Sequence, residues 1–202
     1  MIKAIIFDIG DVLITNVHIY DHIVKELHLD KKKAFPFYVQ AIEELEAGQI
    51  DEARFWIKLK KQLLINQPIP NPSPLVTSHK KVKVAQDVID IVIALKQKGY
   101  KLGLLSNTIK AHKEEIEKLG FFHYFDVKIF SYEVKERKPF PNIYKLTLEQ
   151  LNVLLEEAVF IDNNDSFVKG AERVGITGIQ FINSRQLKRD LHKLEINIRI
   201  QV

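Results

Sequence analysis

The sequence predicts an α/β fold in which helices cover a parallel sheet, with a helical insertion after the first strand. Short apolar runs alternate with longer amphipathic segments, which is typical of strand–helix–strand units. The first two apolar runs, residues 3–7 and 101–105, are separated by far more chain than one connecting helix needs. A length of 202 residues suits one core with a modest insertion.

The predicted strands are short and apolar, so we expect them to be buried in the sheet. In chain order they span residues 3–7, 101–105, 127–130, 158–161 and 178–182. The segments around them repeat apolar residues every three or four positions, as amphipathic helices do. These helices are expected over residues 85–98, 109–119, 141–151, 165–174 and 184–194. Gly99, Gly120 and Gly175 follow three of them as stop signals.

The insertion has a helical pattern of its own. Apolar residues recur at helical spacing around Ile23, Tyr38 and Phe55, and Gly48 precedes a new helix start. Alternating prolines follow at positions 68, 70, 72 and 74. Because such a run cannot continue a helix, we expect the chain to return extended to the core.

The predicted division is a core of residues 1–15 and 84–202 and an insertion of residues 16–83. The tail over residues 195–202 alternates apolar and polar side chains. It is interpreted either as an edge strand or as disorder.

Composition excludes some classes of protein. Without cysteine there is no disulfide, thiolate nucleophile or cysteine-based metal site. No apolar run approaches the ~18 residues of a membrane span, and the one before Asp8 is too short for a signal peptide. We therefore expect a cytoplasmic protein without a membrane partner.

The charged residues do not indicate a nucleic-acid partner. The net charge of +4 comes from 30 basic and 26 acidic residues that are interleaved along the chain. The basic clusters at 31–33 and 79–83 are expected to be solvated faces or loop ends. The seven histidines lack metal-ligand spacing, so surface or core positions are expected for them.

Polar residues follow the predicted strands where each strand ends. Asp8 ends the first run, Ser106 and Asn107 follow the second, and Asp162 follows the fourth. Lys138 lies on the stretch after the third. Because the carboxyl ends of parallel strands share one edge of a sheet, these groups are expected to meet in one crevice.

These groups suit phosphoryl transfer. The Asp8 carboxylate can attack phosphorus and form an aspartyl phosphate. Asp8 and Asp162, with the Gly10 carbonyl as a further oxygen, suit Mg²⁺. The cation and Lys138 offset the repulsion between the carboxylate and the phosphate, while Ser106 and the Asn107 backbone can donate hydrogen bonds to phosphate oxygens.

Four ordered motifs carry a resemblance to a known family. Phe-Asp-Ile-Gly-Asp-Val-Leu, Leu-Leu-Ser-Asn-Thr, Arg-Lys-Pro-Phe-Pro-Asn-Ile-Tyr and Phe-Ile-Asp-Asn-Asn resemble the motifs of the haloacid dehalogenase superfamily of hydrolases. The spacing from Asp162 to Ala171 and Gly175 resembles the fourth motif and its helix. The likeness covers residues 1 to about 182, and the insertion resembles the small cap of one subgroup.

The resemblance implies a Rossmann-like three-layer core with a helical cap. It implies Asp8 as nucleophile and metal ligand, the Gly10 carbonyl and Asp162 as metal ligands, and Ser106 and Lys138 as phosphate binders. Most relatives of this type are Mg²⁺-dependent phosphatases of small phosphorylated metabolites. The Phe-Asp-x-Gly start is similar to that of some sugar-1-phosphate phosphatases.

The first motif departs from the family at Gly10, where phosphatases usually carry a second Asp that acts as acid and base. A positioned proton donor contributes about 10²–10⁴-fold. Asp11 could take that role, the substrate could have a leaving group that needs little protonation, or the protein could be a weak catalyst.

The fourth motif departs at two positions. Asn163 stands where an Asp is frequent, and Asp165 is expected to replace it around the metal ligands. Phe167 stands where a polar residue is common.

Three functions stay open from the sequence. The first is a Mg²⁺-dependent phosphatase of a small phosphorylated metabolite, with a cap that selects the substrate. The second is a phosphate- or partner-binding relative with little catalysis. The third is a 2-haloacid dehalogenase, which Gly10 disfavours because a bulkier residue is expected beside its nucleophile. Monomer and homodimer are both compatible with the sequence.

Overall fold

The computed structural model describes residues 1–198, and its centre is a five-stranded parallel sheet. The strands lie in the order β5-β4-β1-β6-β7, and every neighbouring pair is parallel. Their bounds are β1 Ala4–Phe7, β4 Lys101–Ser106, β5 Val127–Phe130, β6 Ala158–Asp162 and β7 Thr177–Gln180. The predicted α/β fold is confirmed, although β7 ends two residues before the predicted strand does.

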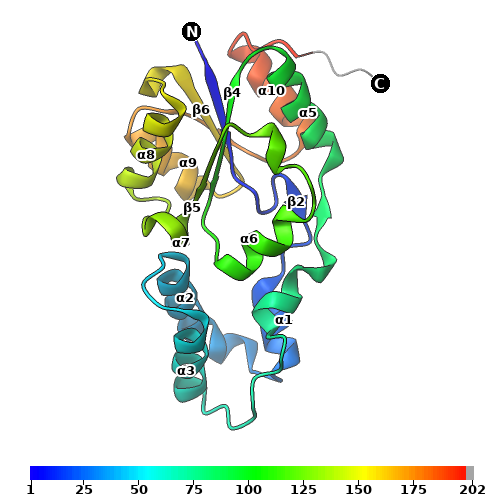
Figure 1. The fold of residues 1–202 in the computed structure, drawn as a ribbon, viewed down its shortest axis with the longest axis vertical. Coiled ribbons are helices and arrows are strands. Elements are labelled where there is room, and N and C mark those ends of the chain that lie inside the picture. Colours follow the sequence, from blue (N-terminus) through cyan, green and yellow to red (C-terminus); the bar gives the residue numbers. More distant parts are fainter. Residues whose placement is uncertain (199–202) are drawn as a thin grey trace.

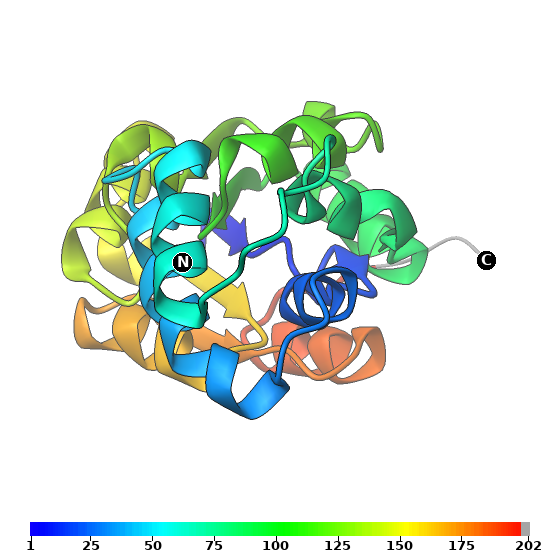
Figure 2. The same cartoon turned by 90° about the horizontal axis from the view of Figure 1, so that it is seen from below.

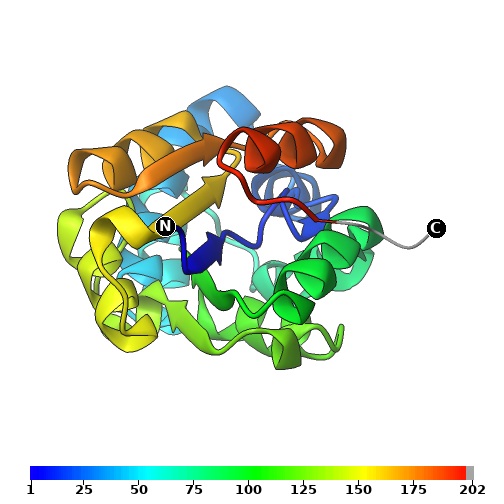
Figure 3. The ribbon, with the colours of Figure 1, turned by 90° about the horizontal axis from the view of Figure 1, so that it is seen from above.

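Helices cover both faces of the sheet (Figure 3). On one face, α5 (Gln86–Gln97) and α10 (Ser184–Lys193) pack against Ile5 and Phe7 of β1. On the other, α8 (Pro141–Leu151) and α9 (Asp165–Arg173) pack against Ala4 and Ile6. Successive side chains of a strand point to opposite faces, so one fully apolar strand supplies both cores.

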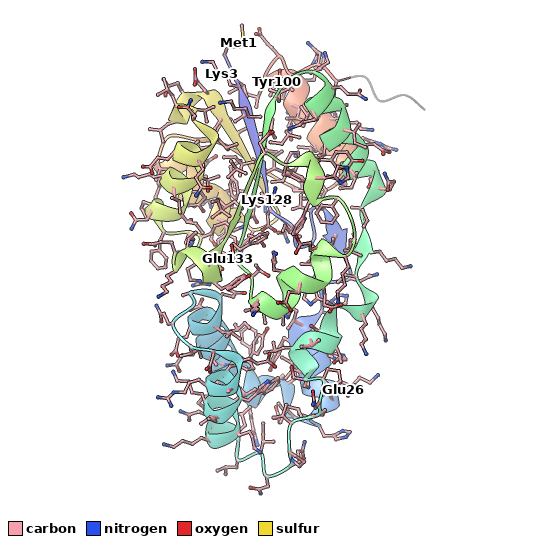
Figure 4. The ribbon with its side chains drawn as sticks, in the orientation of Figure 1. Met1, Lys3, Glu26, Tyr100, Lys128 and Glu133 are labelled. Atoms are coloured by element: carbon pink, nitrogen blue, oxygen red, sulfur yellow. The ribbon has the colours of Figure 1, made fainter. Side chains whose placement is uncertain are left out.

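A second group of helices lies beyond the carboxyl ends of the strands (Figures 1 and 2). It consists of α1 (Ile19–Glu26), α2 (Lys31–Glu46) and α3 (Glu52–Leu63). These helices bury an apolar cluster of their own, which includes Ile23, Tyr38 and Phe55. In Figure 4, Glu26 lies at this end of the molecule, and Met1 and Lys3 lie at the other. The α1–α3 helices are called the cap from here on.

Two short strands join the cap to the core. β2 (Ile14–Thr15) and β3 (Lys83–Val84) pair antiparallel, so the chain leaves and re-enters the core at one place. The expected extended return is wrong in part, because Pro74 begins the short helix α4 (Pro74–Thr77), and the 3₁₀-helix η1 (Ser78–Lys81) follows it. A proline fits the first turn of a helix, where its missing N–H has no intrahelical partner.

The remaining elements connect strands and helices. They are α6 (Lys110–Glu117), η2 (Phe122–Tyr124), α7 (Ser131–Val134) and η3 (Leu155–Glu157). The tail carries no strand over residues 195–198, where Ile196 is instead buried in the α5–α10 core. The rest of that interpreted segment, residues 199–202, lies outside the described residues. Within residues 1–198, no helix combines the length and apolar character that crossing a bilayer requires.

Candidate active site

The carboxyl ends of three neighbouring strands deliver polar side chains to one cavity of about 210 Å³. Asp8 follows β1, Ser106 ends β4 and Asp162 ends β6. All three line the cavity, and each is less than a tenth exposed. The parallel topology alone brings these residues together, since they stand far apart in sequence.

Lys138 joins the two acids. Its loop runs from α7 to α8, and its side chain is fully buried. The ammonium Nζ lies 2.6 Å from Asp8 Oδ1 and 2.6 Å from Asp162 Oδ2. The rings of Phe160 and Phe167 flank it, with centroids 5.4 and 5.1 Å from Nζ. Because removing one partner of such a buried pair leaves an uncompensated charge, the three groups depend on one another.

Asn107 holds Lys138 in position through its side chain. Its Nδ2 donates to the Lys138 carbonyl at 3.0 Å, and its Oδ1 accepts from the Lys138 N–H at 2.9 Å. The side-chain amide is thus engaged with the loop. The predicted hydrogen bond from Asn107 to a phosphate oxygen uses the backbone N–H, not this side-chain amide.

The charges of Asp8 and Lys138 depend on burial and on their neighbours. Burial raises the pKa of Asp8 to about 7, and the nearby Lys138 ammonium opposes that shift. Burial alone would lower the pKa of Lys138, but the attraction of Asp162 and Asp8 outweighs it and raises the pKa. The lysine is therefore a permanent positive charge, and an added cation at the two acids would favour the ionised Asp8 carboxylate.

The donor set fits a hard divalent cation. One ammonium contacts both carboxylates, so the two acids are close enough to share a cation. Gly10 also lines the cavity, and Asp8 Oδ2 lies on its side of the site, 3.9 Å from where a Gly10 Cβ would stand. Mg²⁺ commonly takes one or two carboxylates and keeps several waters. No cluster of three or more His, Cys, Asp or Glu side chains suited to a metal occurs within residues 1–198.

Two of the residues predicted for the site lie outside the cavity. Asp11, in the turn after β1 with φ +54°, is exposed. Its neighbour Gly10 lines the cavity instead, so Asp11 is not placed to move a proton there. Asp165 begins α9 and forms an exposed ion pair with Lys169 at 2.6 Å. By contrast, Asn163 lines the cavity.

The structure adds three polar residues that the sequence patterns did not single out. Glu46, at the end of cap helix α2, lines the cavity opposite the strand ends. His79 and His112 also line it, and their rings stack with centroids 3.9 Å apart. The expectation that His79 belongs to a solvated basic cluster is wrong, because it is only 6% exposed. No spacing signal links these three, which come from different elements.

The chain is similar to known proteins over most of its length. The haloacid dehalogenase-like hydrolase family model matches residues 2–175. The glyceraldehyde 3-phosphate phosphatase of Methanopyrus kandleri is 25% identical over 197 residues, which cover 89% of this chain and 84% of the relative. The phosphorylated carbohydrates phosphatase of Thermotoga maritima is 29% identical over 184 residues, which cover 88% of this chain and 83% of the relative.

A solved structure shares the fold. A mutant HAD family enzyme from Bacteroides thetaiotaomicron, in complex with magnesium and inorganic phosphate, superposes with a TM-score of 0.76. The match covers 93% of this chain and 99% of that one at 22% identity.

Proposed function

The chain belongs to the haloacid dehalogenase-like hydrolase family, and from that premise we propose that it is a Mg²⁺-dependent phosphatase of a small phosphorylated carbohydrate. The observation that carries the proposal is the buried arrangement of Asp8, Lys138 and Asp162 at the strand ends. A nucleophilic carboxylate, a fixed positive charge and a second acid for a cation are the parts that transfer of a phosphoryl group to Asp8 requires.

In the proposed reaction Asp8 attacks the phosphorus and is phosphorylated, and water then hydrolyses the aspartyl phosphate. Lys138 would neutralise negative charge on the transferring group, and the Ser106 hydroxyl and the Asn107 N–H would donate to its oxygens. Mg²⁺, held by Asp8, Asp162 and the Gly10 carbonyl, supplies further charge neutralisation when bound. The Asn107 side chain keeps Lys138 in place through two hydrogen bonds with the Lys138 backbone.

The size of the cavity favours a short substrate. A volume of about 210 Å³ lies below the ~300–1,000 Å³ that is typical of pockets for drug-sized ligands. The cavity therefore suits a smaller ligand, such as a phosphate group with a few carbons. Two relatives are named for glyceraldehyde 3-phosphate and for phosphorylated carbohydrates, which are compounds of the proposed class.

The test is phosphate release from a panel of triose, pentose and hexose phosphates, with Mg²⁺ and with a chelator. We expect release that requires Mg²⁺ and is abolished in Asp8→Asn. Asp11→Asn is the matched control, because it makes the same change in the exposed turn three residues along, and we expect it to retain activity.

The same panel separates the other two functions. Wild-type release no greater than that of Asp8→Asn on every substrate, together with tight phosphate-ester binding, would favour a binding protein. Chelator-resistant halide release from 2-haloacids would favour a dehalogenase.

A further inference from the structure

The first motif carries no acid at Gly10, yet an alkoxide leaving group needs a proton. The cap supplies a carboxyl at the cavity wall. We propose that Glu46 of α2 is the general acid and base of the reaction, in the role that Gly10 leaves empty. This inference rests on the proposed phosphatase function.

The fold holds the end of α2 against the core. Glu46 is the last residue of the helix, and Gly48 follows in the left-handed region with φ +62°. At Gly48 the chain packs so closely on the Tyr132 carbonyl that a Cβ would clash with its oxygen. The cap therefore brings this residue to the cavity by a close backbone contact.

Arg137 fixes the same helix end from the core side. It precedes Lys138, and its guanidinium lies 3.1 Å from Glu43 and 3.6 Å from Glu46. The shorter of the two ion pairs is with Glu43, whose side chain is 48% exposed and does not line the cavity. The Glu46 pair is the longer of the two, and of these two acids only Glu46 lines the cavity, where a substrate atom can reach its carboxyl.

The environment of Glu46 suits proton transfer. Its side chain is 20% exposed and lines the same cavity as Asp8 and Lys138. Burial raises its pKa to about 7, although Arg137 and Lys138 oppose the shift and Glu43 adds to it. A carboxyl with a pKa near neutrality can both donate and accept a proton at the pH of the cell.

The two histidines of the cavity are less suited to this role. His112 uses Nε2 on the Leu75 carbonyl, and His79 uses Nδ1 on the Ser78 hydroxyl. Burial lowers the pKa of His79 to about 4 and that of His112 well below its usual value. Both shifts disfavour the protonated imidazolium that a general acid requires.

The proton balance closes over the two steps. The Asp8 carboxylate forms a bond to phosphorus, the P–O bond of the ester breaks, and the leaving alkoxide takes the proton of the Glu46 carboxyl. Water then attacks the aspartyl phosphate and gives one proton to the Glu46 carboxylate, while the bond from phosphorus to Asp8 breaks. The products are the alcohol and hydrogen phosphate, and both side chains return to their starting states.

The experiment compares Glu46→Gln with Glu43→Gln. Glutamine keeps the size of the side chain and can still accept a hydrogen bond from Arg137, so both variants test charge and proton transfer with little change in shape. Each is measured in steady state on an alkyl phosphate of the triose class. Each is also mixed rapidly with para-nitrophenyl phosphate, whose leaving group departs without a proton.

For Glu46→Gln we expect kcat on the alkyl phosphate to fall by about 10²–10⁴-fold. On para-nitrophenyl phosphate we expect a rapid burst of about one nitrophenol per enzyme and then slow turnover, because phosphorylation of Asp8 needs no acid but its hydrolysis lacks a base. Glu43→Gln is expected to show neither effect.

Two results would overturn the proposal. One is a Glu46→Gln enzyme whose kcat on the alkyl phosphate stays within about a factor of three of wild type. The other is an equal loss in both variants without a burst, which would assign Glu46 to holding the cap through Arg137. Failure of the phosphatase function itself is distinct, because wild type would then release no more product than Asp8→Asn.

Discussion

At Gly10 the structure has room for the acid that the first motif lacks. A Cβ there would approach only Asp8 Oδ2, at an ordinary 3.9 Å. We expect Gly10→Asp to raise turnover of alkyl phosphates, and to do so most strongly in the Glu46→Gln background, where we expect at least about a tenfold gain. Steady-state kinetics measures this gain in turnover, with Gly10→Ala as the control. A gain equal to that of alanine, or none, would contradict a proton-transfer role for the added carboxyl.

His79 makes stability depend on pH. Its folded-state pKa of about 4 lies below its unfolded value near 6.5, so unfolding takes up a proton between those values. The unfolding free energy therefore falls as pH decreases through this window and is retained above it. Two titratable groups face His79. The pKa of His112 is also lowered, and Glu115 opposes the lowering of the His79 pKa.

His79→Phe preserves an aromatic partner for His112 and removes this titration. We expect wild type to lose about 1 kcal/mol more than the variant between about pH 6 and about pH 5. Urea unfolding at the two pH values measures the difference. Parallel losses in the two proteins would show that His79 does not contribute.

Among the helices, α2 depends on Gly48 for its contact with α7. Alanine there must adopt a left-handed φ and also clash with the Tyr132 carbonyl. We expect Gly48→Ala to destabilise the protein by more than the ~1–2 kcal/mol of left-handed strain alone. We also expect it to lower kcat on alkyl phosphates, because Glu46 moves with the helix end.

Gly99→Ala is the matched control for that prediction. Gly99 has φ +83°, but a Cβ there meets nothing within 4 Å. The thermal stability of Gly99→Ala should fall only by the left-handed backbone strain, and the kinetics of this variant should match wild type. Equal effects of the two alanines on stability and kcat would remove the case for a close cap–core contact at Gly48.

Across the whole molecule, Mg²⁺ binding should stabilise the fold. A ligand that binds the folded state alone adds about 2.7 kcal/mol at a hundred times its Kd. We expect Mg²⁺ to raise the melting temperature of chelator-treated wild type and to leave Asp162→Asn unchanged. Asp165→Asn is the control, since that carboxylate pairs with Lys169 at the surface. A full shift in Asp162→Asn would place the cation elsewhere.

Local pattern was sufficient for much of the fold. A strand buried on both faces must be apolar throughout, so β1, β4 and β6 stand out in the sequence. The two-residue strands β2 and β3 are too short to show a period and were missed. The helix at Pro74 was missed because a proline can either end a helix or begin one.

The sequence by itself determined which groups gather at the sheet edge. Asp8, Ser106 and Asp162 each stand at the carboxyl end of a strand, and parallel strands put these ends on one side. That inference needs only the order of elements along the chain, because topology converts order into proximity.

Only the tertiary structure decided which side chains complete the site. Glu46 and His79 enter the cavity because of how the cap docks on the core. The exposure of Asp11 and the attachment of Asn107 to Lys138 follow from loop conformations. Docking angles and loop backbones are set by packing between distant segments, and no periodicity along the chain records such packing.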